Sequence, residues 1–248
     1  MIEARVLQSI DEFEEAVQLQ KQIWGFADIE LLPRRLFVVA NKVGGQTLGA
    51  FDRGRMVAFL IAIPGIKADG THYIHSHMLG TLPEYQDRGL GRRLKLKQRE
   101  EALERGIPLV EWTFDPLELK NAYFNIERLG VIVQRFVPNQ YGTTSSHLHG
   151  GLPTDRCVAE WWLMAPRVLA IIGGNEHVRP ASEARIVVPA NIADLRAADP
   201  DQAREIQSQV REGFLEHFRN GLAVTGFEKT GDHGVYLFGR LAGGPGES

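Results

Sequence analysis

A short turn containing two glycines constrains this chain more than any other feature of its sequence. It lies between an expected strand and a long charged helix, and its residues are Gln86, Asp87, Arg88, Gly89, Leu90, Gly91 and Arg92. Glycine lets the backbone bend tightly, so successive amide groups can point the same way. The helix that follows adds the partial positive charge of its N-terminus. This combination predicts a binding site for a pyrophosphate group.

Two common nucleotide-binding patterns are absent from this turn. It lacks the GxxxxGK[ST] sequence of nucleotide-hydrolysing P-loops and the three-glycine fingerprint of dinucleotide-binding folds. The plain alternative is a helix start that happens to contain glycine. The order of the elements around the turn therefore has to decide between a binding site and a simple helix start.

Hydrophobic periodicity and capping residues predict mixed helices and strands on both sides of the turn. The expected helices are 9–25, 33–44, 90–105 and 116–129, and the expected strands are 47–51, 56–63, 73–79, 110–114, 131–137 and 158–164. Residues 139–153, rich in Gly, Ser, Thr and His, predict a long loop. After Pro180 a second unit is expected, with a helix at 201–219 and strands at 185–188, 223–228 and 235–238.

Composition limits the class of protein and its partners. With 248 residues, 44% of them apolar, the chain is expected to fold as one domain with a sizeable appendage. A net charge of −3 offers no global attraction to nucleic acid or anionic lipid. Cys157 is the single cysteine, which excludes a disulfide framework and predicts a small core residue. We expect a cytoplasmic protein with no nucleic-acid or membrane partner, and a homodimer is left open.

The order of strand, Q-x-x-G-x-G turn, long helix, short strand, helix ending in Leu129-Gly130 and strand resembles the Gcn5-related N-acetyltransferase (GNAT) superfamily. The resemblance covers about residues 1–165. It implies an α/β (α+β) fold with a mixed, mainly antiparallel, splayed sheet flanked by helices. We therefore expect a GNAT acyl-CoA-binding core over residues 1–168 and a C-terminal α/β extension of unknown role over residues 180–240.

The same resemblance implies a cosubstrate, acetyl-CoA or another acyl-CoA, and assigns residues to it. The amides of residues 86–92 would bind its pyrophosphate, and backbone groups of Leu79 and Thr81 would meet the pantetheine arm. Arg92 and Arg93 would be able to approach the phosphates. Three further cations of the helix are expected on its solvated face instead: Lys95, Lys97 and Arg99.

His75 and His77 are the candidate general bases. Side chains alternate along a strand, so both histidines lie on one face, directly before the turn. Histidine can accept a proton near neutral pH, and the H-x-H pair resembles the arylalkylamine N-acetyltransferase branch, where it removes a proton through water. The alternatives are two structural histidines, or a zinc site shared with His72, His147 and His149. Because no HExxH motif accompanies them, we expect no metal.

The family commonly places a thiolate-protonating tyrosine four residues before the glycine of the Leu-Gly pair. Here that position is Ile126. We expect Tyr123 or Asn125 to replace the tyrosine, with Tyr141, Asn121 and solvent as alternatives, and a loss of activity is also left open. Two acidic residues are candidates for binding an acceptor ammonium: Glu111 and Asp115, the latter with a turn or helix cap as its alternative.

The sequence thus predicts an acyl-CoA-dependent N-acyltransferase. The acyl group is expected to be acetyl or another short group, and the acceptor a small amine such as an amino acid. The alternative is a catalytically silent acyl-CoA-binding or sensing module, which the replacement at Ile126 and the C-terminal extension motivate. The identity of the amine, the acyl group, the oligomeric state and the role of the extension cannot be read from the sequence.

Overall fold

The computed structural model describes residues 2–142, 151–177, 179–241, 243 and 246. These residues form two compact units, one reaching to Glu111 and the other starting at Trp112. The boundary falls inside β5 (Leu109–Phe114), so this strand contributes three residues to each unit. The expected limits of the core and the extension, residues 168 and 180, stay a prediction.

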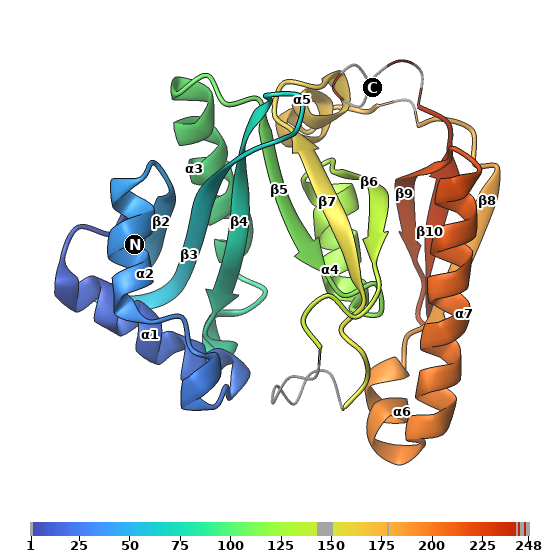
Figure 1. Ribbon diagram of the computed structural model, residues 1–248, viewed down its shortest axis with the longest axis horizontal. Coiled ribbons are helices and arrows are strands. Elements are labelled where there is room, and N and C mark those ends of the chain that lie inside the picture. The colour runs from blue at the N-terminus through green and yellow to red at the C-terminus, as the bar shows by residue number, and fades with distance from the viewer. Residues whose placement is uncertain (1, 143–150, 178, 242, 244–245, 247–248) are drawn as a thin grey trace. The chain divides into compact units, whose positions relative to one another are not determined.

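The first unit is a mostly antiparallel sheet with the strand order β1-β2-β3-β4-β5, in which only β4 and β5 run parallel. Figure 1 labels β2, β3, β4 and β5 of this sheet. Its strands are β1 (Glu3–Val6), β2 (Gln46–Asp52), β3 (Arg55–Ile66), β4 (His72–Thr81) and the start of β5, and its helices are α1 (Ile10–Trp24), α2 (Arg34–Lys42) and α3 (Leu90–Glu104), with short 3-10 turns at Asp28–Glu30 and Pro83–Tyr85.

Helices cover both faces of this sheet. Phe37 of α2 lies against Phe59 of β3, with ring centroids 6.0 Å apart. Ala62 is three residues further along β3 and therefore points to the opposite face. Its cross-strand partner Ser76 bonds to Lys95 of α3. Helices α1 and α2 thus pack on one face, and α3 packs on the other.

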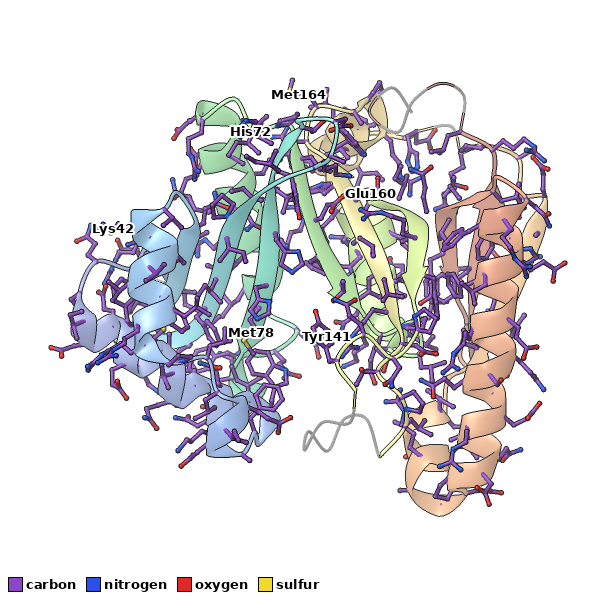
Figure 2. The ribbon with its side chains drawn as sticks, viewed as in Figure 1. Lys42, His72, Met78, Tyr141, Glu160 and Met164 are labelled. Carbon is purple, nitrogen blue, oxygen red and sulfur yellow. The ribbon has the colours of Figure 1, made fainter. Side chains whose placement is uncertain are left out.

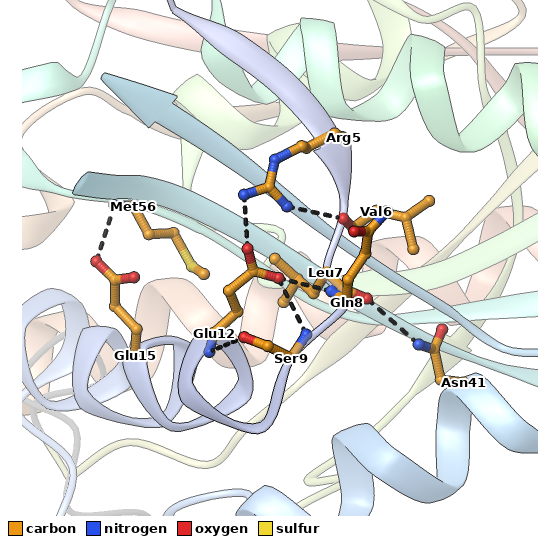
Figure 3. Close-up of polar contacts among 9 residues, drawn as sticks. All are labelled: Arg5, Val6, Leu7, Gln8, Ser9, Glu12, Glu15, Asn41 and Met56. Carbon is orange, nitrogen blue, oxygen red and sulfur yellow. Dashed lines mark hydrogen bonds and ion pairs between the residues drawn. The ribbon is translucent and has the colours of Figure 1, made fainter. Parts of the chain in front are cut away.

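The start of α1 follows directly from local sequence. The Ser9 hydroxyl accepts a hydrogen bond from the Glu12 amide, and the Glu12 carboxylate accepts one from the Ser9 amide, which completes a capping box. Glu12 also pairs with Arg5 of β1 at 2.6 Å, and this contact lowers the pKa of the Glu12 carboxyl (Figure 3). The cap therefore also ties the helix to the first strand.

The second unit continues from β5 with the strand order β5-β7-β6-β9-β10-β8. Its strands are β6 (Ile132–Val137), β7 (Arg156–Trp162), β8 (Ala184–Pro189), β9 (Ala223–Lys229) and β10 (His233–Gly239), and its helices are α4 (Leu119–Tyr123), continued by a π-helical turn at Phe124–Arg128, α5 (Pro166–Gly173), α6 (Ile192–Ala198) and α7 (Pro200–Arg219). The core forms where Phe214 of α7 meets Phe136 of β6 and Tyr236 of β10, at centroid distances of 5.2 and 5.0 Å.

The predicted mixed fold is confirmed, including the long helix after the glycine turn, although some elements differ from the prediction. The sequence-based prediction missed β1, α5 and α6, because short segments give little periodic signal. The strand expected to end at residue 63 continues through Pro64 and Gly65 to Ile66. Gly65 fits there because a Cβ would lie 2.5 Å from the Tyr73 ring. None of the described helices has the length and apolar character needed to cross a membrane.

Candidate functional site

The glycine turn has the backbone geometry of an anion site. Asp87 and Gly89 both adopt positive φ angles, of 59° and 75°. Gly89 is the N-cap of α3 and provides no side-chain cap, and its carbonyl accepts the amide of Arg93 at 3.0 Å. An α-helix offers no internal acceptor to its first amides. The amides of Leu90 and Gly91 therefore form the candidate phosphate cradle, and Arg92 follows them in the helix.

Several contacts fix the residues that precede and follow the cradle. The hydroxyl of Tyr85 donates to Asp52 Oδ2 at 2.8 Å, and the Arg88 guanidinium lies 4.8 Å from the centre of the Tyr85 ring. The amide of Gln86 donates to the carbonyl of Pro83 at 3.2 Å. Arg93 donates to the carbonyl of Ile2 at 2.5 Å, so its side chain binds the residue that precedes β1.

Lys95 departs from the expectation for this helix. It was expected on the solvated face with Lys97 and Arg99, but that prediction is wrong, because Lys95 is buried and its Nζ lies 2.9 Å from Ser76 Oγ. Burial places its pKa well below the ordinary lysine value. The helical spacing could have indicated this, since Lys95 shares a face with the buried Leu94, Gln98 and Ala102.

His75 and His77 lie side by side on β4, with ring centroids 5.9 Å apart. His75 is half-buried and His77 is exposed. Surrounding protein atoms lower the pKa of both imidazoles, and the neighbouring His77 lowers that of His75 further. Lowered pKa values leave both rings neutral near pH 7, the form that can accept a proton.

The strand carrying this pair is irregular at His77. Ile61 of β3 faces Met78, but Ala62 faces Ser76, so His77 is an additional residue in β4. The register of β4 with β5 comprises three pairs and ends with His75 opposite Glu111. Leu79 and Thr81 follow, half-buried, and pair in register with Leu60 and Ala58.

Glu111 and Asp115 both have basic partners. Glu111 is buried and pairs with Lys67 at 2.7 Å. Asp115 Oδ1 accepts the amide of Leu117 at 2.8 Å, which confirms the turn role, and Asp115 Oδ2 lies 2.9 Å from Arg196. We therefore assign neither carboxylate to an acceptor ammonium.

The candidates for protonating the thiolate lie in the second unit and differ in exposure. Tyr123 ends α4 and is 40% exposed, whereas Asn125 is buried within the π-helical turn. Ile126 is fully buried, and its carbonyl accepts a hydrogen bond from Arg167. The position at which the resemblance predicts a tyrosine is thus part of the core.

Tyr141 is a further phenol in the second unit, after β6 (Figure 2). Its hydroxyl lies 3.1 Å from the Thr113 hydroxyl of β5, and its side chain is 48% exposed. The Arg156 guanidinium lies 5.5 Å from the centre of its ring. The sequence could not predict this contact, because Thr113 and Tyr141 are 28 positions apart and only the tertiary structure brings them together.

Cys157 is fully buried, which confirms it as a core residue, and burial raises its thiol pKa. Within the described ranges no cluster of three His, Cys, Asp or Glu side chains could hold a metal ion. Two of the histidines considered for zinc, His147 and His149, lie outside the described residues.

Comparison with known protein families matches the N-terminal half of the chain. Residues 10–130 match the model of the acetyltransferase (GNAT) family, whose members use acetyl-CoA. No curated protein matched the sequence.

Solved structures show the same fold over about two thirds of the chain. The ribosomal-protein-S18-alanine N-acetyltransferase of Escherichia coli is 19% identical, covering 64% of this chain and 92% of its own, with a TM-score of 0.50. A GNAT-family acetyltransferase of Streptococcus pneumoniae is 16% identical, covering 64% and 98%, with a TM-score of 0.53. Arabidopsis thaliana NAA60, solved with acetyl-CoA, is 14% identical, covering 65% and 99%, with a TM-score of 0.53.

Proposed function

We propose that this chain transfers an acetyl or other short acyl group from coenzyme A to a small amine such as an amino acid, because residues 10–130 match the model of the acetyltransferase (GNAT) family. The observation that carries the proposal is the cradle at the start of α3. Positive φ angles at Asp87 and Gly89 precede helix amides whose acceptors must come from outside the helix. Such a site suits the diphosphate of an acyl-CoA.

The reaction requires the acceptor amine to lose a proton as it attacks the thioester carbonyl. A C–N bond forms, the C–S bond breaks, and the coenzyme A thiolate leaves and gains a proton. The neutral imidazole of His75 or His77 would take the amine proton through a water molecule. A backbone amide near Leu79 would stabilise the oxyanion that develops on the carbonyl.

The proton for the departing thiolate needs a different donor from the usual tyrosine, because the side chain of Ile126 has no proton to give. We propose Tyr123 or Asn125 for this role, with Tyr141 and solvent as alternatives. Tyr123 combines a phenolic proton with 40% exposure, whereas Asn125 is buried. If a Tyr123→Phe variant keeps unchanged turnover, the Tyr123 hydroxyl is not the proton donor.

Ile126 also favours a second candidate, a silent acyl-CoA-binding module. A coupled experiment separates the two functions. Calorimetry would measure acetyl-CoA binding, and a thiol assay would follow coenzyme A release in the presence of amino acids, polyamines, arylalkylamines and short peptides with free N-termini. Binding together with release supports the enzyme, and the acceptor giving the highest kcat/KM identifies its class. Binding without release from any acceptor supports the silent module.

A further inference from the structure

A buried polar chain connects α3 to β4 and β2 in the first unit. Lys95 Nζ lies 2.9 Å from Ser76 Oγ on β4 and 3.1 Å from Gln98 Oε1. Gln98 Nε2 donates to Gln46 Oε1 of β2 at 3.1 Å, and Gln46 Nε2 donates to the Gln98 carbonyl at 2.9 Å. Lys95 and the three residues it joins in this chain are all at most 5% exposed.

A contribution to stability does not by itself explain why these four polar side chains are buried together. Burying an amine has a large desolvation cost, and the net contribution of a hydrogen bond to stability is small beside it. Apolar side chains of similar shape can be neutral or more stable at such positions. The contact that Lys95 makes with β4 therefore points to a role beyond packing.

Ser76 stands between the two histidines of the proposed base. It faces α3, whereas His75, its neighbour on the strand, points to the other face, where its ring lies beside that of His77. Ser76 is also the last paired residue before the additional residue His77. A bulge leaves the local strand conformation less fixed by the ladder. The hydrogen bond between Lys95 and Ser76 restrains β4 next to the bulge, from the face opposite the two histidines.

We propose that Lys95 is a positioning residue for the histidine pair, acting through Ser76 to fix β4 at the His77 bulge. This inference rests on the proposed function, because it assigns a purpose to the alignment of His75 and His77. It also links two parts of the first unit, since Lys95 lies one turn after the phosphate cradle on the same helix.

The test compares Lys95→Met with Lys97→Met at a saturating concentration of whichever amine gives the highest kcat/KM in the coenzyme A release assay. Methionine keeps the length and apolar stem of lysine but cannot donate to Ser76. We expect Lys95→Met to lower kcat by about 10- to 100-fold, as misplaced catalytic groups do, while KM for acetyl-CoA stays unchanged. Lys97 is two residues further on, where it pairs with the exposed Glu100, and Lys97→Met should leave both constants unchanged.

Two further comparisons separate positioning from general damage. Ser76→Thr keeps a hydroxyl for Lys95 and should retain most of the turnover that Ser76→Ala loses. In a His75→Ala, His77→Ala background, Lys95→Met should cause no additional loss, because nothing remains to be positioned. If Lys95→Met fails to fold, the two serine variants carry the test alone.

The outcomes distinguish this inference from the proposed function. An equal loss from Lys95→Met with and without the histidines, or a raised KM for acetyl-CoA with unchanged kcat, overturns the positioning role. Full turnover of Ser76→Ala overturns it as well. If the histidine variants alone lose turnover and the Lys95 variant does not, only this inference fails. If the histidine variants keep full turnover, the assignment of His75 and His77 as the base is overturned, and the positioning role of Lys95 falls with it.

Discussion

Asp115 Oδ2 lies 2.9 Å from Arg196 Nη2, although the two residues are 81 positions apart in the sequence. Both side chains are buried, at 6% and 5% exposed. Arg196 also pairs with Glu118, at the start of α4, at 2.9 Å. The ion pair therefore fastens α6 to the turn that follows β5. Both segments belong to the second unit.

Removing one partner of this pair should destabilise the second unit strongly. Arg196→Ala leaves the buried carboxylate of Asp115 without its guanidinium, and such changes cost about 3–5 kcal/mol. Urea unfolding followed by circular dichroism would measure the loss. Arg204→Ala on α7 is the matched control, because that arginine pairs with Asp201 on the exposed helix surface. Equal losses from the two variants would contradict the buried pair's importance.

Substitution of the histidines should act on turnover and leave donor binding intact. We expect His75→Ala and His77→Ala each to lower kcat more than they raise KM for acetyl-CoA, because the rings serve the proton and not the phosphates. General bases typically contribute 10²–10⁴-fold, so a loss in about that range is expected for the ring that accepts the proton. Steady-state kinetics at several acetyl-CoA concentrations would measure both constants. Full turnover in both variants would exclude the pair as the base.

The pH dependence should follow the lowered pKa values of the same rings. A general base works only when neutral, so kcat should fall as the pH drops through the pKa of the imidazole. Burial lowers this pKa in His75 and His77, and the midpoint of the acid limb should therefore lie below 6.5. Glu111 opposes the shift of His75, so Glu111→Gln should move the midpoint further down. A midpoint above 6.5 would point to another titrating group.

Gly89→Val should weaken acetyl-CoA binding, for a reason that lies in the backbone. A Cβ at Gly89 would meet no atom within 4 Å, so the substitution causes no steric clash inside the protein. The residue instead holds a φ of 75°, which a β-branched side chain strongly disfavours. Realigned amides should raise Kd by about tenfold, equivalent to ~1.4 kcal/mol. Calorimetry with acetyl-CoA would measure this change.

Gly54 provides the control for that variant. It has a φ of 85°, a Cβ placed on it would also meet no atom within 4 Å, and it lies in the turn between β2 and β3. Gly54→Val should therefore introduce comparable backbone strain without affecting the donor. Equal weakening by both substitutions would mean that general destabilisation, and not the cradle, explains the effect.

Local chemistry made a large part of this molecule predictable. Ser9 and Glu12 identify the start of α1, Asp199 caps α7, and the glycine turn identifies the start of α3. Each signal depends on residues within one or two turns of each other, so it is readable without knowledge of the fold. The same holds for His75 and His77, because strand alternation places them together.

The order of the amino acids was therefore enough to predict most of the succession of elements, apart from β1, α5 and α6, together with the candidate phosphate cradle and the histidine pair. Three-dimensional packing was needed to show that Lys95 is buried against Ser76, that Ile126 belongs to the core and that Asp115 meets Arg196. Burial and long-range ion pairs depend on which surfaces the fold brings together, and a single sequence carries no direct record of those distances. Local propensity determines where many helices and strands begin, whereas tertiary packing determines which side chains are buried and desolvated.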